Sequence, residues 1–255
     1  MLYSIPPFLT LVCYVAIGGL VLHNGLKSLV NKLLFLICLA GTFLYLDILI
    51  IFNIASDAVA LWTSRLDHCC VVFTIPLFMH FFRAYLNIFS HKWALWLAYA
   101  YSIALMPFAL TPLLIQGMQQ YDFGFFGRGG LLYPLIGAGA VTALLYCLFW
   151  LGWTIHREKS SVQKNKLKYL CAGFAFMGVL NGLNVLPILG YPVYPLGTFS
   201  FIPLTVFAVG LFRYDLLDMG LLLRKSLLYS LLTAFLICIY SLLVILANAT
   251  LARYA

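Results

Sequence analysis

Long apolar runs, separated by short polar breaks, cover nearly the whole chain. Each run approaches the roughly 20 residues that an α-helix needs to cross a bilayer. The pattern predicts an all-α, polytopic integral membrane bundle with a seven-helix core and an eighth helix. The predicted spans are 4–22, 33–53, 68–89, 93–114, 131–154, 168–189, 197–214 and 226–248. We expect a seven-transmembrane domain at 1–220, followed by an additional helix and a C-terminal tail at 221–255.

The composition supports a membrane setting and argues against an enzyme. Hydrophobic residues make up 64% of the chain and charged residues 9%, with a mean hydropathy of +1.04, whereas a soluble domain has roughly a quarter of its residues charged. The lipid bilayer is therefore an expected partner. The patterns GxSxG, HExxH and the phosphate-binding GK[ST] loop are absent, and the seven cysteines form no CxxC pair. We expect no catalytic residues, no cofactor and no metal site.

The distribution of Lys and Arg predicts the orientation in the membrane. Of the 15 basic residues, 12 fall in, or within a few residues of, the breaks that follow the first, third, fifth and seventh spans. Cytoplasmic loops carry such an excess of positive charge, so we expect the N-terminus outside. The net charge of +8 then reflects topology, with anionic lipid head groups as an expected contact of 156–168. Nothing indicates nucleic acid binding.

Polar residues near the outer ends of the spans are the candidate ligand-binding residues, because a polar group in hydrocarbon needs a partner or water. We expect Asp47, in the second span, to lie near Asp67 and His68 at the start of the third, and near Asn181 and Asn184 in the sixth. Together these side chains predict an outward-facing pocket. The alternative is a set of interfacial residues that only satisfy topology, with Asp47 in a structural pair with Arg65 or with a neighbouring Asn.

Small residues predict close helix contacts in the fifth and sixth spans. Gly178 and Gly182 form a GxxxG pattern, and Gly137, Gly139 and Ala140 lie in the fifth span. This spacing brings helix backbones together. The spacing is explained by packing within one chain, and a homodimer is an alternative use of the same surface.

The region 166–219 carries several motifs that together suggest a family. Lys166-Leu-Lys-Tyr169 begins the sixth span, and NGLNVLP (181–187), YPLG (194–197) and FRYDLLD (212–218) follow. This series resembles the seven-transmembrane N-terminal sensory region of bacterial histidine kinases, which also precedes some diguanylate cyclases. HFFRAY (80–85) and FGRGGLLYPL (126–135) are similar to that family's third helix and to the start of its fifth. Met219 stands where the family has Ile.

The resemblance implies a signal-input module of two-component systems in the bacterial inner membrane. An unknown small or lipophilic ligand would bind on the outer side, near Asp47, Asp67, His68, Asn181, Asn184 and Tyr194. The signal would leave through Arg213, Tyr214, Asp215 and Asp218 toward a kinase or cyclase output, which we expect to be separate or missing from this chain. The alternatives are a small transporter or permease, and a structural subunit of a membrane complex.

The stretch NVLPILGYPVYPLGTF (184–199) combines three prolines and two glycines with apolar side chains. We expect a rigid outer turn between the sixth and seventh spans, because proline restricts the backbone. Tyr191 and Tyr194 suit the lipid interface. Such a turn predicts that the two helices move as one unit.

Overall fold

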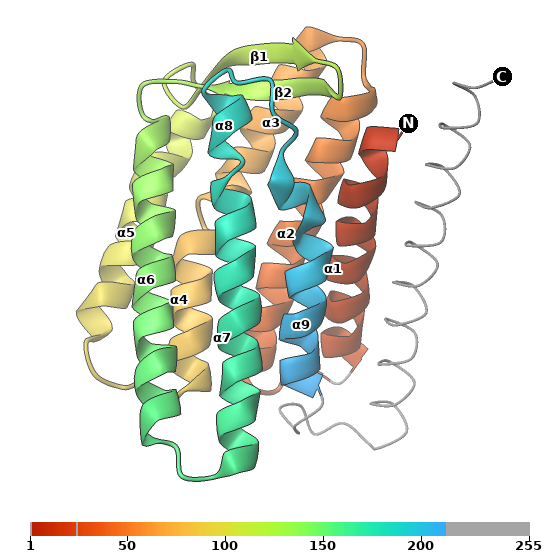
Figure 1. Ribbon diagram of the computed structural model, residues 1–255. Coiled ribbons are helices and arrows are strands. Elements are labelled where there is room, and N and C mark those ends of the chain that lie inside the picture. Colours follow the sequence, from red (N-terminus) through yellow and green to blue (C-terminus); the bar gives the residue numbers. More distant parts are fainter. Residues whose placement is uncertain (1, 24, 213–255) are drawn as a thin grey trace, which may run out of the picture.

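A computed structural model describes residues 2–23 and 25–212, which form a bundle of long helices with one β-hairpin across its end (Figure 1). In this part of the chain, five segments are long and apolar enough to cross a membrane. They are Leu2–His23, Leu29–Asn53, Asp57–Tyr85, Tyr133–Arg157 and Ser161–Ile188. Lys92–Ala109 is not among them, and Leu196–Leu211 is shorter. The helical membrane bundle is therefore present, whereas the count of seven spans stays a prediction.

The helices follow the order of the apolar runs. The elements are η1 (Leu2–Ser4), α1 (Ile5–His23), α2 (Leu29–Asn53), α3 (Asp57–Val71), α4 (Thr74–Tyr85), α5 (Lys92–Ala109), α6 (Tyr133–Arg157), α7 (Ser161–Gly182), α8 (Val185–Ile188), η2 (Leu196–Ser200) and α9 (Phe201–Phe212). The predicted eighth span at 226–248 lies outside the described residues.

The third span differs from its predicted bounds of 68–89. Helix α3 begins at Asp57, where the Ser56 side chain accepts a hydrogen bond from the Val59 amide at 3.4 Å and caps the helix. The helical path is interrupted at Val72 and Phe73 before α4 continues it. Asp67 and His68 thus lie ten residues and more into a helix, well below its outer end, because the polar segment before them is helical rather than a loop.

A β-hairpin lies between α5 and α6, where the sequence predicts only helix and loop. Strands β1 (Ile115–Tyr121) and β2 (Gly124–Gly129) pair antiparallel, with Tyr121 opposite Gly124. Gly124 has φ +120°, and a Cβ there would lie 2.5 Å from the Cα of Phe52, so the turn needs glycine. The Tyr121 hydroxyl donates to the carbonyl of Pro187 at 2.7 Å. The mostly helical bundle thus carries one small hairpin in its described part, and the hairpin is attached to the ends of other helices.

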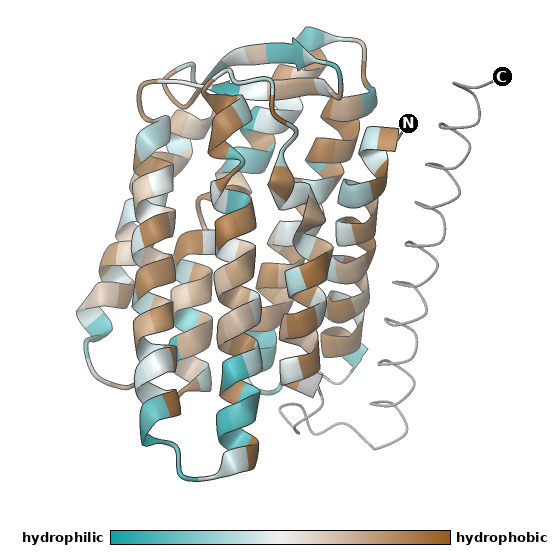
Figure 2. Ribbon diagram, in the orientation of Figure 1, coloured by the Kyte–Doolittle hydropathy of each residue, from teal (hydrophilic) through white to brown (hydrophobic). Residues whose placement is uncertain are grey.

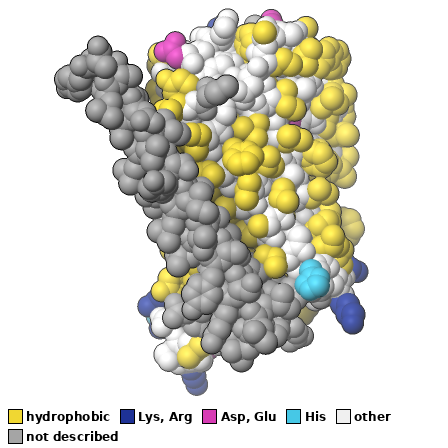
Figure 3. Space-filling view, turned by 90° about the vertical axis from the view of Figure 1, so that its right-hand side faces the viewer, with side chains coloured by type: hydrophobic (Ala, Val, Ile, Leu, Met, Phe, Trp, Pro, Cys, Tyr) yellow, Lys and Arg dark blue, Asp and Glu magenta, His cyan; other side chains and the backbone are white. Residues whose placement is uncertain are grey.

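Hydropathy separates the middle of the bundle from its ends. Apolar residues cover the long middle section of the helices, and hydrophilic residues gather at the turn between α6 and α7 and around the hairpin (Figure 2). In Figure 3, hydrophobic side chains cover most of the visible flank, and the prominent Lys and Arg side chains lie at the end opposite the hairpin. This arrangement suits a bundle with lipid around its middle.

Candidate ligand-binding cavity

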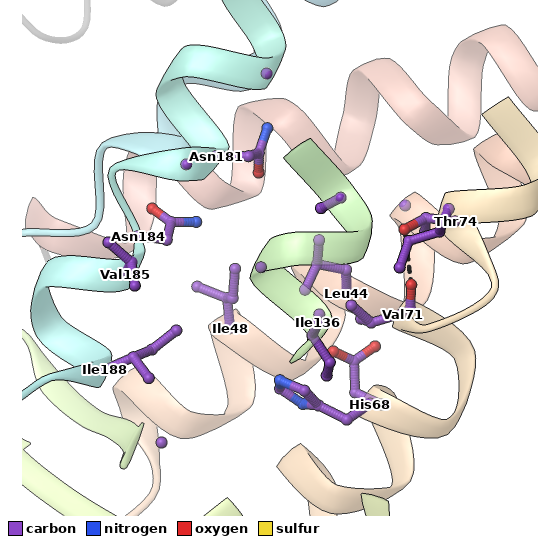
Figure 4. A pocket seen from close by; sticks show the side chains of 18 of the residues that line it. Leu44, Ile48, His68, Val71, Thr74, Ile136, Asn181, Asn184, Val185 and Ile188 are labelled. Carbon is purple, nitrogen blue, oxygen red and sulfur yellow. Dashed lines mark hydrogen bonds between the residues drawn. The ribbon is translucent and has the colours of Figure 1, made fainter. Parts of the chain in front are cut away.

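A cavity of about 450 Å³ lies inside the bundle, among α2, α3, α4, α6, α7 and α8, with residues of the hairpin at one end. Its lining is mostly aliphatic and aromatic, with Ile48, Val71, Ile136 and Ile188 among the residues drawn in Figure 4. A volume of this size lies in the range of roughly 300–1,000 Å³ that small-molecule sites occupy. The cavity is therefore large enough for a ligand with an apolar body.

Two carboxyl groups line this apolar cavity. Asp47 and Asp67 are each 6% exposed. The Ser64 hydroxyl donates to Oδ2 of Asp47 at 3.0 Å, while Oδ1 of Asp47 and both carboxyl oxygens of Asp67 have no hydrogen-bond partner among the described residues. Buried polar groups are nearly always partnered, and leaving one without a partner costs about 1–3 kcal/mol. These three acceptor oxygens are therefore available to hydrogen-bond donors of a bound molecule.

Arg65 does not neutralise these acids. Its Nη2 donates to the carbonyl of Ile115 at 3.0 Å, and its guanidinium lies 5.8 Å from the Trp62 ring centroid. Arg65 thus attaches α3 to the hairpin, and the structural pair of Asp47 with Arg65 that the sequence left open is not formed among the described residues. The partner of Asp47 is Ser64, one residue earlier on α3.

His68 lines the cavity beside Tyr133. Its Nδ1 lies 2.7 Å from the carbonyl oxygen of Ser64. Because a carbonyl oxygen only accepts, Nδ1 carries a hydrogen and donates, and in the neutral form of the ring Nε2 is then the acceptor. The His68 and Tyr133 ring centroids are 6.1 Å apart. This side of the cavity thus combines an imidazole with an aromatic face.

Asn181 and Asn184 lie on the opposite side of the cavity from His68 (Figure 4), and both bind the segment that follows the outer turn. Nδ2 of Asn181 donates to the hydroxyl of Ser200 at 2.9 Å, and Oδ1 of Asn184 accepts from the amide of Gly197 at 2.7 Å. The cavity wall is therefore hydrogen-bonded to η2, directly before α9 begins.

Gly197 is held from both sides. While its amide donates to Asn184, its carbonyl accepts from the Tyr45 hydroxyl at 2.7 Å. A Cβ at Gly197 would lie 2.2 Å from Nδ2 of Asn184, so any larger residue would require the Asn184 side chain to shift. The two motifs NGLN and YPLG, which support the family resemblance, thus meet in one contact. The turn is attached to α2 as well as to Asn184, which lies between α7 and α8.

Tyr194 is placed elsewhere than the sequence predicts. It does not line the cavity; its hydroxyl donates to the carbonyl of Tyr3 at 2.7 Å, and its ring stacks on that of Tyr3 at 5.6 Å. Phe52 and Phe123 contact the same ring. Burial raises the pKa of Tyr194 to about 12, so the hydroxyl stays a donor at neutral pH. Tyr194 fastens the turn to the start of the chain.

Five of the six candidate ligand-binding residues line one cavity, namely Asp47, Asp67, His68, Asn181 and Asn184. The signal-exit residues Arg213, Tyr214, Asp215 and Asp218 lie outside the described residues. Sequence reasoning overlooked Ser64 and Tyr133. Ser64, Asp67, His68 and Val71 follow the i, i+3, i+4, i+7 spacing of one helix face, a pattern that points to α3 once 57–71 is read as a helix.

Metal binding has no support in the described part of the chain, where no group of three or more His, Cys, Asp or Glu side chains is suitably placed. The cavity instead combines a hydrophobic wall with a few polar groups, an arrangement typical of sites for small organic molecules.

Comparison of the chain with protein-family models, with curated proteins and with solved structures finds no match. The case for a function therefore rests on the motifs of the chain and on the cavity itself.

Proposed function

We propose that the chain is a membrane-embedded sensory module of the histidine-kinase-associated type, in which a ligand in the cavity changes the position of α9. The observation that carries this proposal is the double role of Asn181 and Asn184, which line the cavity and also bind Ser200 and Gly197. A ligand that contacts these amides alters the hydrogen bonds that position η2.

The energetic requirement is a difference in ligand affinity between two arrangements of the helices. Close packing makes α7 and α9 respond together, since a Cβ at Gly173 would lie 2.8 Å from the amide nitrogen of Phe207. Couplings of this kind typically amount to about 1–3 kcal/mol. That is enough to bias the segment after α9, where Arg213, Tyr214, Asp215 and Asp218 form the proposed signal exit.

The proposed location is the bacterial inner membrane, with the hairpin and the N-terminus outside. The basic segment between α6 and α7 and the hairpin lie at opposite ends of the bundle (Figures 1 and 2), in keeping with the excess of positive charge on cytoplasmic loops. A separate kinase or cyclase output, or a second copy of the chain, is the proposed partner on the cytoplasmic side.

A small transporter is the second candidate, favoured by one observation. The interruption between α3 and α4 at Val72–Phe73 and the one between α7 and α8 at Leu183–Asn184 flank segments that line the same cavity. Interrupted helices around a central site are frequent in transporters. Uptake of a cavity ligand into proteoliposomes separates a transporter from a sensor, which binds without moving its ligand across.

Coupling is tested by amide hydrogen exchange in lipid nanodiscs, with decanol as an uncharged probe. Saturating decanol is expected to change the rate of amide hydrogen exchange in residues 196–205 about fivefold. This factor corresponds to the lower end of typical coupling free energies. In Asn184→Ala, which lacks the bond to Gly197, the change is expected to disappear.

Asn31→Ala is the matched control, because the Asn31 side chain likewise hydrogen-bonds a glycine backbone, at the carbonyl of Gly25, but does not line the cavity. This variant is expected to respond as the wild type does. Unchanged exchange in the wild type, or an equal response in Asn184→Ala, contradicts the sensory proposal.

A further inference from the structure

The cavity wall sets the first property of a ligand. Ile37, Leu44, Ile75, Phe78, Phe174 and Met177 are among the apolar lining residues. Burial of apolar surface stabilises a complex by about 25 cal/mol per Å². The greater part of the ligand is therefore apolar.

The cavity has a side opening between α6 and α7. Gly137 on α6 and Gly182 on α7 line it and are nevertheless exposed, and a Cβ added at either glycine would have no atom within 4 Å. Val141 and Val185 also line it and are 55% and 41% exposed. Further along, the same two helices close up, since a Cβ at Gly178 would lie 2.6 Å from Leu144. The opening is thus bordered by small and apolar residues on the flank of the bundle, a surface suited to lipid.

The polar groups set the second property. The ionisable side chains that line the cavity are two acids, one imidazole and the phenols of Tyr14 and Tyr133, and neither Lys nor Arg lines it. Oδ1 of Asp47 and both oxygens of Asp67 lack donors among the described residues. A primary ammonium group has three N–H donors and no acceptor. It thus brings as many donors as there are acceptor oxygens without partners, together with the opposite charge.

We propose that the cavity binds a membrane-dissolved primary alkylamine or a similar cationic amphiphile, which enters between α6 and α7 and places its ammonium group at Asp47 and Asp67. This inference rests on the proposed ligand-sensing function and adds the chemical class of the ligand. An anionic amphiphile meets two carboxyl groups, and no Lys or Arg side chain lines the cavity to compensate its charge. A neutral alcohol of equal length fills the apolar part and leaves most of the unpartnered oxygens without donors.

The test measures equilibrium binding of radiolabelled decylamine, decanol and decanoate to the chain in nanodiscs, with excess unlabelled compound defining the specific part. Decylamine is expected to bind about tenfold or more tightly than decanol, the range expected for hydrogen bonds to a charged group. Decanoate is expected to bind weakest. Asp67→Asn is expected to reduce the affinity for decylamine about tenfold and to leave that for decanol within about twofold.

Two matched controls separate an effect on ligand binding from a general effect of the substitution on folding. Asp57→Asn removes an exposed acid at the first turn of the same helix and is expected to leave both affinities unchanged. Gly182→Leu fills the side opening and is expected to slow decylamine association, whereas Gly152→Leu places the same side chain in open space on α6 away from the cavity and is expected to have no effect.

The outcomes separate the two proposals. Equal affinities for decylamine and decanol, or an Asp67→Asn variant that binds decylamine as the wild type does, overturn the amine inference while cavity binding stands. Absence of specific binding by all three compounds overturns the ligand-sensing function as well. Unchanged association in Gly182→Leu overturns the entrance between α6 and α7.

Discussion

Replacing Gly197 with alanine is expected to lower the free energy of unfolding by about 3 kcal/mol, because overpacking and a lost hydrogen bond act together. The added Cβ would lie 2.2 Å from Nδ2 of Asn184, so the asparagine has to move and its bond to the Gly197 amide is lost. Displacing the turn also weakens the bond from Tyr45 to the Gly197 carbonyl. Unfolding in mixed micelles by increasing denaturing detergent measures this loss.

Gly19→Ala is the matched control for this prediction. Gly19 lies in α1, and a Cβ there would have no atom within 4 Å, so the variant is expected to unfold as the wild type does or slightly later, since alanine favours helix. If Gly197→Ala and Gly19→Ala have the same stability, the turn does not have the tight attachment that we ascribe to it.

Replacing Asp67 with leucine is expected to raise the free energy of unfolding by about 1–3 kcal/mol in the absence of ligand, because a buried carboxyl group without partners is removed. Asp67 is 6% exposed and neither oxygen has a partner among the described residues. The same unfolding assay measures the gain. Residues retained for binding often reduce stability, so a more stable variant with poorer amine binding is the combined result that we expect.

Ser64→Ala serves as the comparison for Asp67→Leu. It removes the hydrogen bond that Asp47 accepts from Ser64 and is expected to destabilise the protein by about 1–2 kcal/mol, a change of the opposite sign. If Asp67→Leu destabilises the protein as well, the Asp67 carboxyl group contributes to folding, and its place in the cavity is structural.

Much of the helical framework follows from the apolar runs, because length and hydropathy alone decide whether a segment suits a bilayer. The apolar pattern does not predict a helix over 57–67, because Asp57, Arg65 and Asp67 interrupt it. In the structure Asp57 is an exposed first-turn residue, and Arg65 and Asp67 are buried. Helix α3 is thus recognisable by its Ser56 cap and by the spacing of its inward face, and not by hydropathy.

The hairpin was missed for a different reason. Strands β1 and β2 are short, and their side chains show no strict alternation of polar and apolar character, as in GFFGRG (124–129). Their position depends on distant contacts, such as Gly124 against Phe52 and Tyr121 with Pro187. Such contacts between residues far apart in sequence cannot be read from a local pattern.

The candidate site can be recognised in part from the sequence, because a polar residue within an apolar span is energetically costly and is therefore often functional. Asp47, Asn181 and Asn184 were identified on that ground, and all three line the cavity. Tyr194 is also predicted to contact the ligand, but it does not line the cavity and instead donates to the carbonyl of Tyr3. The sequence can identify a candidate residue, whereas the structure is needed to distinguish a ligand contact from a structural contact.

Photolabelling tests most directly the central claim that the cavity, with its side opening between α6 and α7, is a ligand site. A decylamine that carries a diazirine on its chain is irradiated with the protein in nanodiscs, and labelled peptides are mapped by mass spectrometry. We expect label at 136–144 and 174–188, suppressed by excess unlabelled decylamine and appearing more slowly in Gly182→Leu than in the wild type. Label that unlabelled decylamine does not suppress, spread over the exposed residues of α1 and α5, would contradict the account.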